Sequence, residues 1–332
     1  MFKRLINKLR GLKISYITYN FFHRKKLQHN QHLYKQLHIK KPVYWNISSE
    51  DFARLPQNRP WLDEPGAKEK LIIDEAYLRL PAAVQQYLVQ WTEQGFIILE
   101  NFLSIAEADA VNAEVAKLLQ EKKIKPLDNG KIMFAFKQSL LLNKLIRDER
   151  ITGLFELMFQ QPVIPFQTIN FLKGSQQRAH SDSIHMTTYP LGYLAAAWFA
   201  LEDIDDTNGS LFYYPGSQQL PYVLSHDFDH KTGVLQLDPA LNFQYEEKIA
   251  DTIQKADLTK KDFYAKKGDV FLWHANLIHG GNAITDESRT RKSMVVHYFA
   301  KDVIKYHEIS KRPALLDAST ASRNDKIKKG PE

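Results

Sequence analysis

The second half of the chain consists of many short apolar runs separated by turn signals, and this pattern constrains the fold more than any other feature. Short strands that follow one another without helices between them favour a β-sandwich or barrel and disfavour a doubly wound parallel sheet. Helical patterns precede them, so we predict an α+β fold. From Val163 onward the runs are PVIPFQTINFL, LGYLAAAWFAL, SLFYY, DVFLWHANLIH and SMVVHYFA.

The part before these runs has clear helix signals. Pro81 to Gln94 has the pattern of a helix that Gly95 ends. Ser104 is suited to cap an amphipathic helix that runs to about Lys122, and another helix is predicted from Asp148 to about Gln160. Between the first two helices, Phe96 to Phe102 is apolar and β-branched enough to form a strand.

The amino-acid composition excludes several classes of functional site. The 332 residues are 44% hydrophobic and 25% charged, which is typical of a globular protein. The chain has no cysteine, and this excludes thiolate zinc sites, iron–sulfur clusters and cysteine nucleophiles. The absence fits a reducing compartment, and we predict a cytoplasmic location. Neither a GxGxxG nor a Walker A sequence is present, so the sequence gives no support for a loop that binds nucleotide phosphates.

Positive charge is concentrated at the N-terminus. Residues 1–49 hold 11 Lys or Arg and no acidic residue, and the rest of the chain has a net charge of −4. A basic amphipathic helix is predicted at the start, and two interpretations stay open: peripheral contact of residues 1–26 with an anionic membrane, or docking on the main domain. No secretory signal or transmembrane helix is expected. The apolar positions at helical spacing are Phe2, Leu5, Ile6, Leu9 and Leu12.

These features predict three segments. Residues 1–80 form a basic N-terminal extension followed by a wrap rich in Pro and Trp. Residues 81–310 form the main domain, and residues 311–332 form a polar C-terminal tail. The sequence leaves the oligomeric state open.

His180 and Asp182 are the first candidates for chemistry. They follow a predicted strand, Gln167 to Leu172, and lie two residues apart, so their side chains can point the same way. Imidazole and carboxylate are the ligands of the two-His, one-carboxylate set that holds non-haem Fe(II). His279, 99 residues after His180, is the best third ligand, because a jelly roll can bring a later strand beside an earlier one. A hydrogen-bonded core histidine is the alternative for His279.

Arg291 is the residue that points to a cosubstrate beside the candidate metal ligands. It lies 12 residues after His279 and opens the strand RKSMVVHYFA, where it could project into a barrel. A buried arginine is costly without an anionic partner, and a dicarboxylate cosubstrate would satisfy it through paired hydrogen bonds. The alternative is a surface arginine among the basic neighbours Arg289 and Lys292.

From about Gly95 to Ala300 the sequence resembles the phytanoyl-CoA dioxygenase family of Fe(II)- and 2-oxoglutarate-dependent oxygenases. The resemblance depends on five ordered elements. They are GFIILENFLSIAEADAV, the pair His180-Ser181-Asp182, the strand and turns AAAWFALEDIDDTNGSLFYYPGS, the run HANLIHGGN, and RKSMVVHYF.

The resemblance implies a double-stranded β-helix core, that is, a cupin-like jelly roll, with flanking helices and a helical or irregular N-terminal extension. It implies that His180, Asp182 and His279 bind the iron and that Arg291, or Arg289 as the fallback, binds 2-oxoglutarate. Gln177 and Trp198 match positions that often line the cosubstrate. The chain departs from the family at Gln218, where His is common, which we interpret as a structural difference. It also departs at Gly281, where the family often has a Ser that can touch the cosubstrate, so details of the 2-oxoglutarate pocket are expected to differ.

The implied reaction consumes O2 and 2-oxoglutarate, hydroxylates an aliphatic C–H, and releases succinate and CO2. Asp182 favours hydroxylation, because related halogenases have a small residue at that position. The alternatives are a zinc hydrolase that uses the same three ligands and a non-catalytic jelly-roll binding protein. A nucleic-acid partner is not expected, because no known module accompanies the basic segment.

Substrate identity is not encoded in a readable motif. We predict a small-molecule or lipid-like substrate, and the basic start favours the lipid-like class. We expect its pocket residues in two stretches, Asp128 to Ser139 and Leu220 to Lys267.

Overall fold

The computed structural model describes residues 12–127, 129–228, 238 and 240–316. Most of the predicted N-terminal amphipathic helix, residues 2–11, lies outside them. The helices are α2 (Lys13–Phe22), α3 (Gln31–Gln36), α4 (Ala67–Leu71), α5 (Glu75–Leu78), α6 (Ala82–Gln94), α7 (Ile105–Gln120), α8 (Leu140–Leu145), α9 (Glu149–Phe159) and α10 (Leu241–Lys255). The strands are β1 (Phe96–Leu99), β2 (Ile132–Met133), β3 (Val163–Phe171), β4 (Thr187–Tyr189), β5 (Leu194–Ala200), β6 (Leu211–Tyr213), β7 (Lys261–Phe263), β8 (Val270–His274), β9 (His279–Gly281), β10 (Ser293–Ala300), β11 (Ile304–His307) and β12 (Arg312–Pro313).

A large antiparallel sheet forms the centre, with the strand order β1-β8-β5-β10-β3-β2. Both of its faces are covered, so strands such as β5 are buried along their whole length. Successive side chains point to opposite faces. On β10, Met294 and Val296 join the cluster under the helices, whereas Val295 joins the cluster on the inner face.

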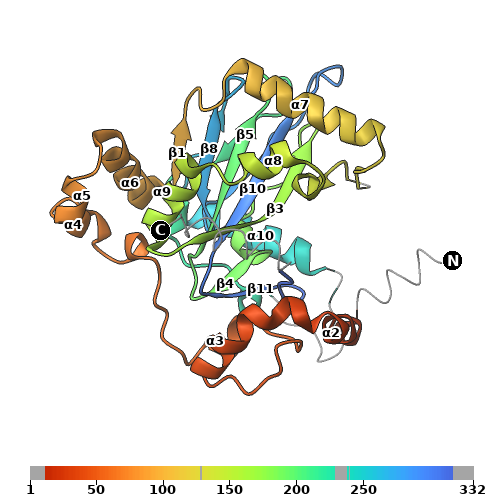
Figure 1. Cartoon of the computed structure of the whole chain (residues 1–332). Helices are drawn as coiled ribbons and strands as arrows, with labels where there is room; N and C mark the ends of the chain where they lie inside the picture. Colours follow the sequence, from red (N-terminus) through yellow and green to blue (C-terminus); the bar gives the residue numbers. More distant parts are fainter. Residues whose placement is uncertain (1–11, 128, 229–237, 239, 317–332) are drawn as a thin grey trace, which may run out of the picture.

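Helices α6 to α9 cover the outer face of this sheet, and Figure 1 shows α7 and α8 lying across it. The predicted helix limits agree with the structure within a few residues. Ser104 caps α7 and forms a capping box with Glu107, and Asp148 caps α9. β1 is shorter than the predicted strand Phe96 to Phe102, because Asn101 takes a left-handed backbone conformation and bonds to Asp269.

Two three-stranded sheets complete the core, β7-β6-β9 and β12-β11-β4. The β7-β6-β9 sheet faces the inner side of the large sheet across an apolar layer that includes Trp198, Leu211 and Phe271. This arrangement confirms the predicted α+β fold with a jelly-roll core.

The N-terminal extension packs on the β12-β11-β4 sheet. Tyr34, Ile47 and Phe52 form one apolar cluster with Tyr189 of β4 and Tyr306 of β11. Figure 1 shows α2 and α3 at this end of the molecule, beside β4 and β11. The division at residues 80 and 310 stays a prediction, and contacts cross it.

Glu308 makes one of those crossing contacts. Its fully buried carboxylate accepts hydrogen bonds from the backbone N–H and the hydroxyl of both Ser49 and Ser225. The N–H of Ile47 also donates to the carbonyl of Lys311 at 2.8 Å. The extension is therefore tied to the core by polar and apolar contacts. None of the helices in the described ranges has the length and hydropathy needed to cross a membrane.

Candidate active site

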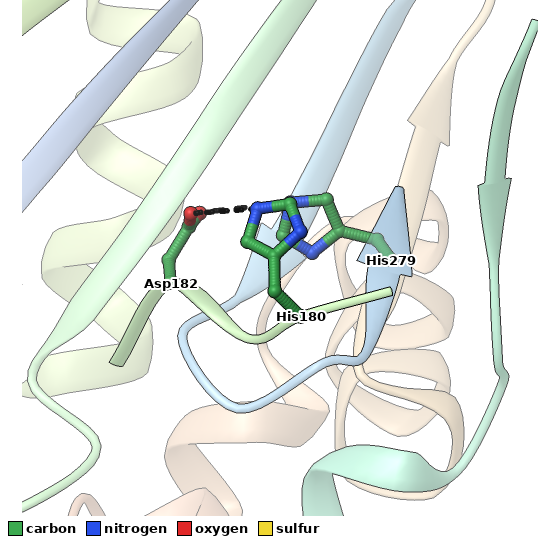
Figure 2. Close-up of side chains that lie close together, drawn as sticks. All are labelled: His180, Asp182 and His279. Atoms are coloured by element: carbon green, nitrogen blue, oxygen red, sulfur yellow. Dashed lines mark ion pairs between the residues drawn. The ribbon is translucent and has the colours of Figure 1, made fainter. Parts of the chain in front are cut away.

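Two distant segments bring His180 and His279 together. His180 lies in the loop after β3, and His279 opens β9. The backbones of the two residues form an antiparallel bridge, with reciprocal N–H to carbonyl bonds of 3.0 and 2.9 Å. Asp182 begins the short helical turn that follows His180. Figure 2 shows the three side chains pointing toward one another.

The three buried side chains are arranged like a ligand set. Among the described residues, they form the one group of His, Asp or Glu side chains whose ligand atoms lie close enough to hold a metal ion, all within 4.8 Å. Nε2 of His180 and Nε2 of His279 each lie 3.9 Å from Oδ1 of Asp182. These distances are too long for direct hydrogen bonds and leave room for an ion between the side chains.

Backbone carbonyls fix the tautomer of both histidines. Nδ1–H of His180 donates to the carbonyl of Arg178 at 2.8 Å, and Nδ1–H of His279 donates to that of Leu277 at 2.9 Å. Each Nε2 therefore presents a lone pair toward Asp182, as metal-binding histidines do. Burial and the neighbouring His279 lower the pKa of His180 to about 3, and burial also lowers the pKa of His279. Both rings are neutral at neutral pH and can act as ligands.

Two residues that the sequence analysis missed hold the Asp182 carboxylate. Nε1–H of Trp273 donates to Oδ2 at 2.8 Å, and Nε2 of His297 lies 3.3 Å from the same oxygen. Oδ1 is left to face the two histidine ligands. Both residues occupy inward positions on β8 and β10, so strand alternation is the signal that could have identified them.

Arg291 is buried in the same cavity as the triad. Its guanidinium lies 5.6 Å from the ring centre of Phe171 and 5.5 Å from that of Trp198. Its Nε has no hydrogen-bond partner, and no ion pair joins it to the described residues. Burial lowers its pKa to about 10, so the group stays charged at neutral pH.

Arg289 lies elsewhere. It is partly exposed, pairs with Asp205 and donates to the hydroxyl of Thr207 at 2.9 Å. Of the two arginines, the structure thus puts Arg291 beside the triad and Arg289 at the surface.

Gln177 and Trp198 also line the cavity. Nε2 of Gln177 lies 3.1 Å from Nε2 of His180. The side-chain oxygen Oε1 of Gln177 accepts a hydrogen bond of 3.0 Å from Nζ of Lys131. Burial lowers the pKa of Lys131. A polar chain therefore extends from the triad to a lysine, on the β2 side of the cavity.

The cavity has a volume of about 970 Å³, which is at the upper end for small-molecule sites. The stretch from Asp128 to Ser139 contributes lining residues, including Met133 and Phe134, as expected. None of the described residues from Leu220 to Lys267 lines the cavity, so the structure gives no support to the expectation for this second stretch. α10 packs behind the triad loop instead, where the hydroxyl of Tyr245 accepts from the N–H of Ser181 at 2.9 Å.

A jelly roll with two histidines and one aspartate converging in a cavity defines the class of non-haem iron oxygenases. Residues 91–292 match the sequence profile of the family described as "Phytanoyl-CoA dioxygenase (PhyH)". The chain belongs to this family of 2-oxoglutarate-dependent dioxygenases. Family membership favours a dioxygenase over the zinc-hydrolase and binding-protein alternatives.

Two curated relatives illustrate the relationship. The chain is 28% identical to the ectoine dioxygenase of Nocardia farcinica over 230 residues, covering 63% of this chain and 76% of the relative. It is 30% identical to the peroxisomal phytanoyl-CoA dioxygenase of Rattus norvegicus over 133 residues, covering 39% and 35%. The second match spans about a third of its relative, so it says little about the whole protein.

Solved structures agree on the fold. EctD from S. alaskensis, with 2-oxoglutarate and 5-hydroxyectoine, has a TM-score of 0.53 at 20% identity, and the match covers 74% of this chain and 85% of EctD. The carbocyclase SnoK from nogalamycin biosynthesis has a TM-score of 0.53 at 18% identity, with 70% and 88% covered. At these identities the likeness shows the shared fold alone.

Proposed function

We propose that this protein hydroxylates an aliphatic C–H group of a lipid-like or acyl substrate and converts 2-oxoglutarate to succinate and CO2. Fe(II) would be held by His180, Asp182 and His279. Arg291 would bind the distal carboxylate of 2-oxoglutarate, with Gln177 and Trp198 beside the cosubstrate.

The unpaired Arg291 is the observation that carries this proposal. A buried cation with no anionic partner is costly, and this one lies in the cavity of the triad. A carboxylate of 2-oxoglutarate would supply the missing partner through charge-assisted hydrogen bonds. The hydroxyl of Ser293, two residues later, is also buried without a partner, and in extended chain it projects to the same side. A zinc hydrolase gives neither group a role.

The donor set of the triad fits Fe(II). Two neutral imidazoles and one carboxylate leave further coordination positions open, and bound iron supplies the oxidative chemistry with O2 and 2-oxoglutarate. The protein's own part is orientation. The carbonyls of Arg178 and Leu277 fix the two rings, and Trp273 with His297 fixes Asp182. The Asp182 carboxylate also takes the position that a halide would need, which supports hydroxylation.

The test is an anaerobic titration of the purified protein with Fe(II) and 2-oxoglutarate, followed by visible charge-transfer absorbance. We expect a band in the wild type, none in His279→Ala, and a weakened band in Arg291→Ala that higher 2-oxoglutarate concentrations restore. Arg289→Ala is the matched control and should behave like the wild type. The absence of a band in folded wild-type protein would overturn the proposal.

We also propose a cytoplasmic location with reversible contact of residues 1–26 with an anionic membrane. Support comes from the basic N-terminus and from exposed aromatic residues on α2, where Phe22 is 74% exposed and Tyr19 is 54% exposed. In co-sedimentation, wild-type protein should bind phosphatidylglycerol vesicles in preference to phosphatidylcholine vesicles, and Phe22→Ser should bind less. Phe243→Ser, at an exposed position of α10, is the control. Equal binding to both vesicle types would contradict this proposal.

A further inference from the structure

The cavity extends beyond the part of the chain that matches the family. Besides residues within 91–292, its walls include Ser15, Tyr16, Tyr19 and Asn20 of α2 and residues 312–316 at the other terminus. Backbone hydrogen bonds hold the C-terminal segment in place. The N–H of Ala314 donates to Lys305, and the N–H of Leu316 donates to Lys26, just after α2. The two terminal segments thus form one end of the cavity, which we call the terminal wall.

The cavity has a strong excess of positive charge. Asp182 is the single acidic residue among the described residues that line it, whereas Lys131, Arg291 and Arg312 are basic. On the proposed function Asp182 is committed to iron and Arg291 to the cosubstrate. The remaining charge favours an anion, because a cleft with apolar walls and charges of one sign attracts the opposite charge strongly.

Arg312 lies on the terminal wall and is poised for such an anion. Its guanidinium lies 5.4 Å from the ring centre of Tyr16, and no ion pair or hydrogen bond joins its side chain to the described residues. An aromatic face holds the planar guanidinium by a cation–π contact and leaves its N–H edges free to donate. Those donors match a carboxylate or phosphate.

Much of the cavity wall is apolar. Phe166 and Phe299 stack with ring centres 4.2 Å apart, and Met133, Met186 and Leu315 also line the cavity. Such walls suit a hydrocarbon part of a ligand.

We propose that Tyr16 and Arg312 of the terminal wall bind a negatively charged group of the substrate, carboxylate or phosphate, while its apolar part lies along the aromatic and aliphatic walls toward the triad. This rests on the proposed function. It assigns substrate selection to segments outside residues 91–292 and narrows the lipid-like class to anionic amphiphiles.

The experiment measures binding of short amphiphiles to the full-length protein loaded anaerobically with Fe(II) and 2-oxoglutarate. Octyl phosphate and octanoate supply the two anions, and 1-octanol and octyltrimethylammonium supply neutral and cationic heads on the same chain. Isothermal titration calorimetry should show that at least one of the two anions binds about tenfold more tightly than 1-octanol, or tighter still. Arg312→Gln should remove that preference and leave 1-octanol binding unchanged. Tyr16→Leu should weaken the anions more than 1-octanol.

Arg79→Gln is the matched control, because Arg79 is an exposed arginine paired with Glu75. It should leave all affinities unchanged, and circular dichroism checks the fold of each variant. Equal binding of charged and neutral amphiphiles, or an anion preference that survives Arg312→Gln, would overturn the inference. Binding to phosphatidylglycerol vesicles without binding of any dissolved anion would also overturn it, since charge would then be recognised at the protein surface.

The charge-transfer band separates this inference from the proposed function. If the wild type and Arg312→Gln both show the band but octyl phosphate and octanoate show no preference, the dioxygenase assignment stands and the substrate inference fails. If the wild type shows no band, the dioxygenase assignment itself fails.

Discussion

At the triad end of the cavity, each of the three triad side chains is fixed by a hydrogen bond of its own, whereas at the terminal wall the side chain of Arg312 contacts one aromatic face. His180 and His279 donate to backbone carbonyls, and Asp182 accepts from Trp273. Arg312, by contrast, has its guanidinium over the ring of Tyr16 and makes no side-chain hydrogen bond or ion pair with the described residues. The triad residues and Trp273 lie within residues 91–292, and Tyr16 and Arg312 lie outside them.

The two ends differ in how precisely their side chains must be oriented. A metal site requires ligands in fixed tautomers and orientations, and strand pairing with backbone carbonyls can supply this. A subsite that recognises charge tolerates a looser arrangement, since a cation attracts an anion over several ångströms. The triad end therefore depends on core strands, and the terminal wall can be built from surface segments.

The largest effect is expected from Asp182→Ala, which removes the carboxylate of the triad. Fe(II) affinity should fall more than 100-fold, since loss of a ligand exceeds the tenfold to 100-fold cost of losing an outer hydrogen bond. Anaerobic titration calorimetry measures this affinity. Asp205→Ala, an exposed aspartate, is the control. Wild-type affinity in Asp182→Ala would remove Asp182 from the site.

Trp273→Phe tests whether the carboxylate needs its partner. The change keeps an aromatic ring on β8 but deletes the 2.8 Å bond to Oδ2. Fe(II) affinity should fall about tenfold to 100-fold. The protein should still bind octyl phosphate more tightly than 1-octanol, because the substitution does not change the terminal wall. Trp45→Phe, at a partly exposed tryptophan, gives the background. If both variants bind iron equally, the indole bond does not orient Asp182.

Much of the triad end could be predicted from sequence. His180 and Asp182 lie two residues apart, and Ser104 and Asp148 begin helices through bonds to residues within one turn. Such signals are local. Arg291 was identified because a cation within an apolar strand pattern needs a partner, and its burial agrees with that argument.

The terminal wall could not be predicted in the same way. Tyr16 and Arg312 are almost 300 residues apart, and no local sequence pattern shows that the ring of Tyr16 will lie under the guanidinium of Arg312. Likewise, no local pattern shows that α10 packs behind Ser181. His297 and Trp273 were missed because facing Asp182 depends on which strands pair and in what register.

Glu308→Gln tests how firmly the extension that carries α2 is attached. The substitution removes the negative charge that four donors from Ser49 and Ser225 share, and it brings an amide N–H among them. The free energy of unfolding should fall by about 2 kcal/mol, and the extension should become more sensitive to protease. Urea unfolding measures the first effect. Glu50→Gln, at a half-exposed partner of Lys311, should change it by less than about 0.5 kcal/mol. An unchanged midpoint in Glu308→Gln would show that the Glu308 carboxylate does not hold the extension.

The smallest effect concerns His29, which lies between α2 and α3. Burial, together with the nearby Lys305, lowers its pKa from 6.5 to about 3. The unfolded chain therefore binds more protons than the folded chain between these values, so the contribution of His29 to stability is complete above pH 6.5 and is lost as the pH falls toward 3. His29→Gln should make stability fall less on acidification, by at most about 1.4 kcal/mol per pH unit. Urea unfolding at pH 6.5 and 5.5 measures this difference, with the exposed His226→Gln as the control. If His29→Gln keeps the wild-type slope, His29 does not contribute to the acid sensitivity of the fold.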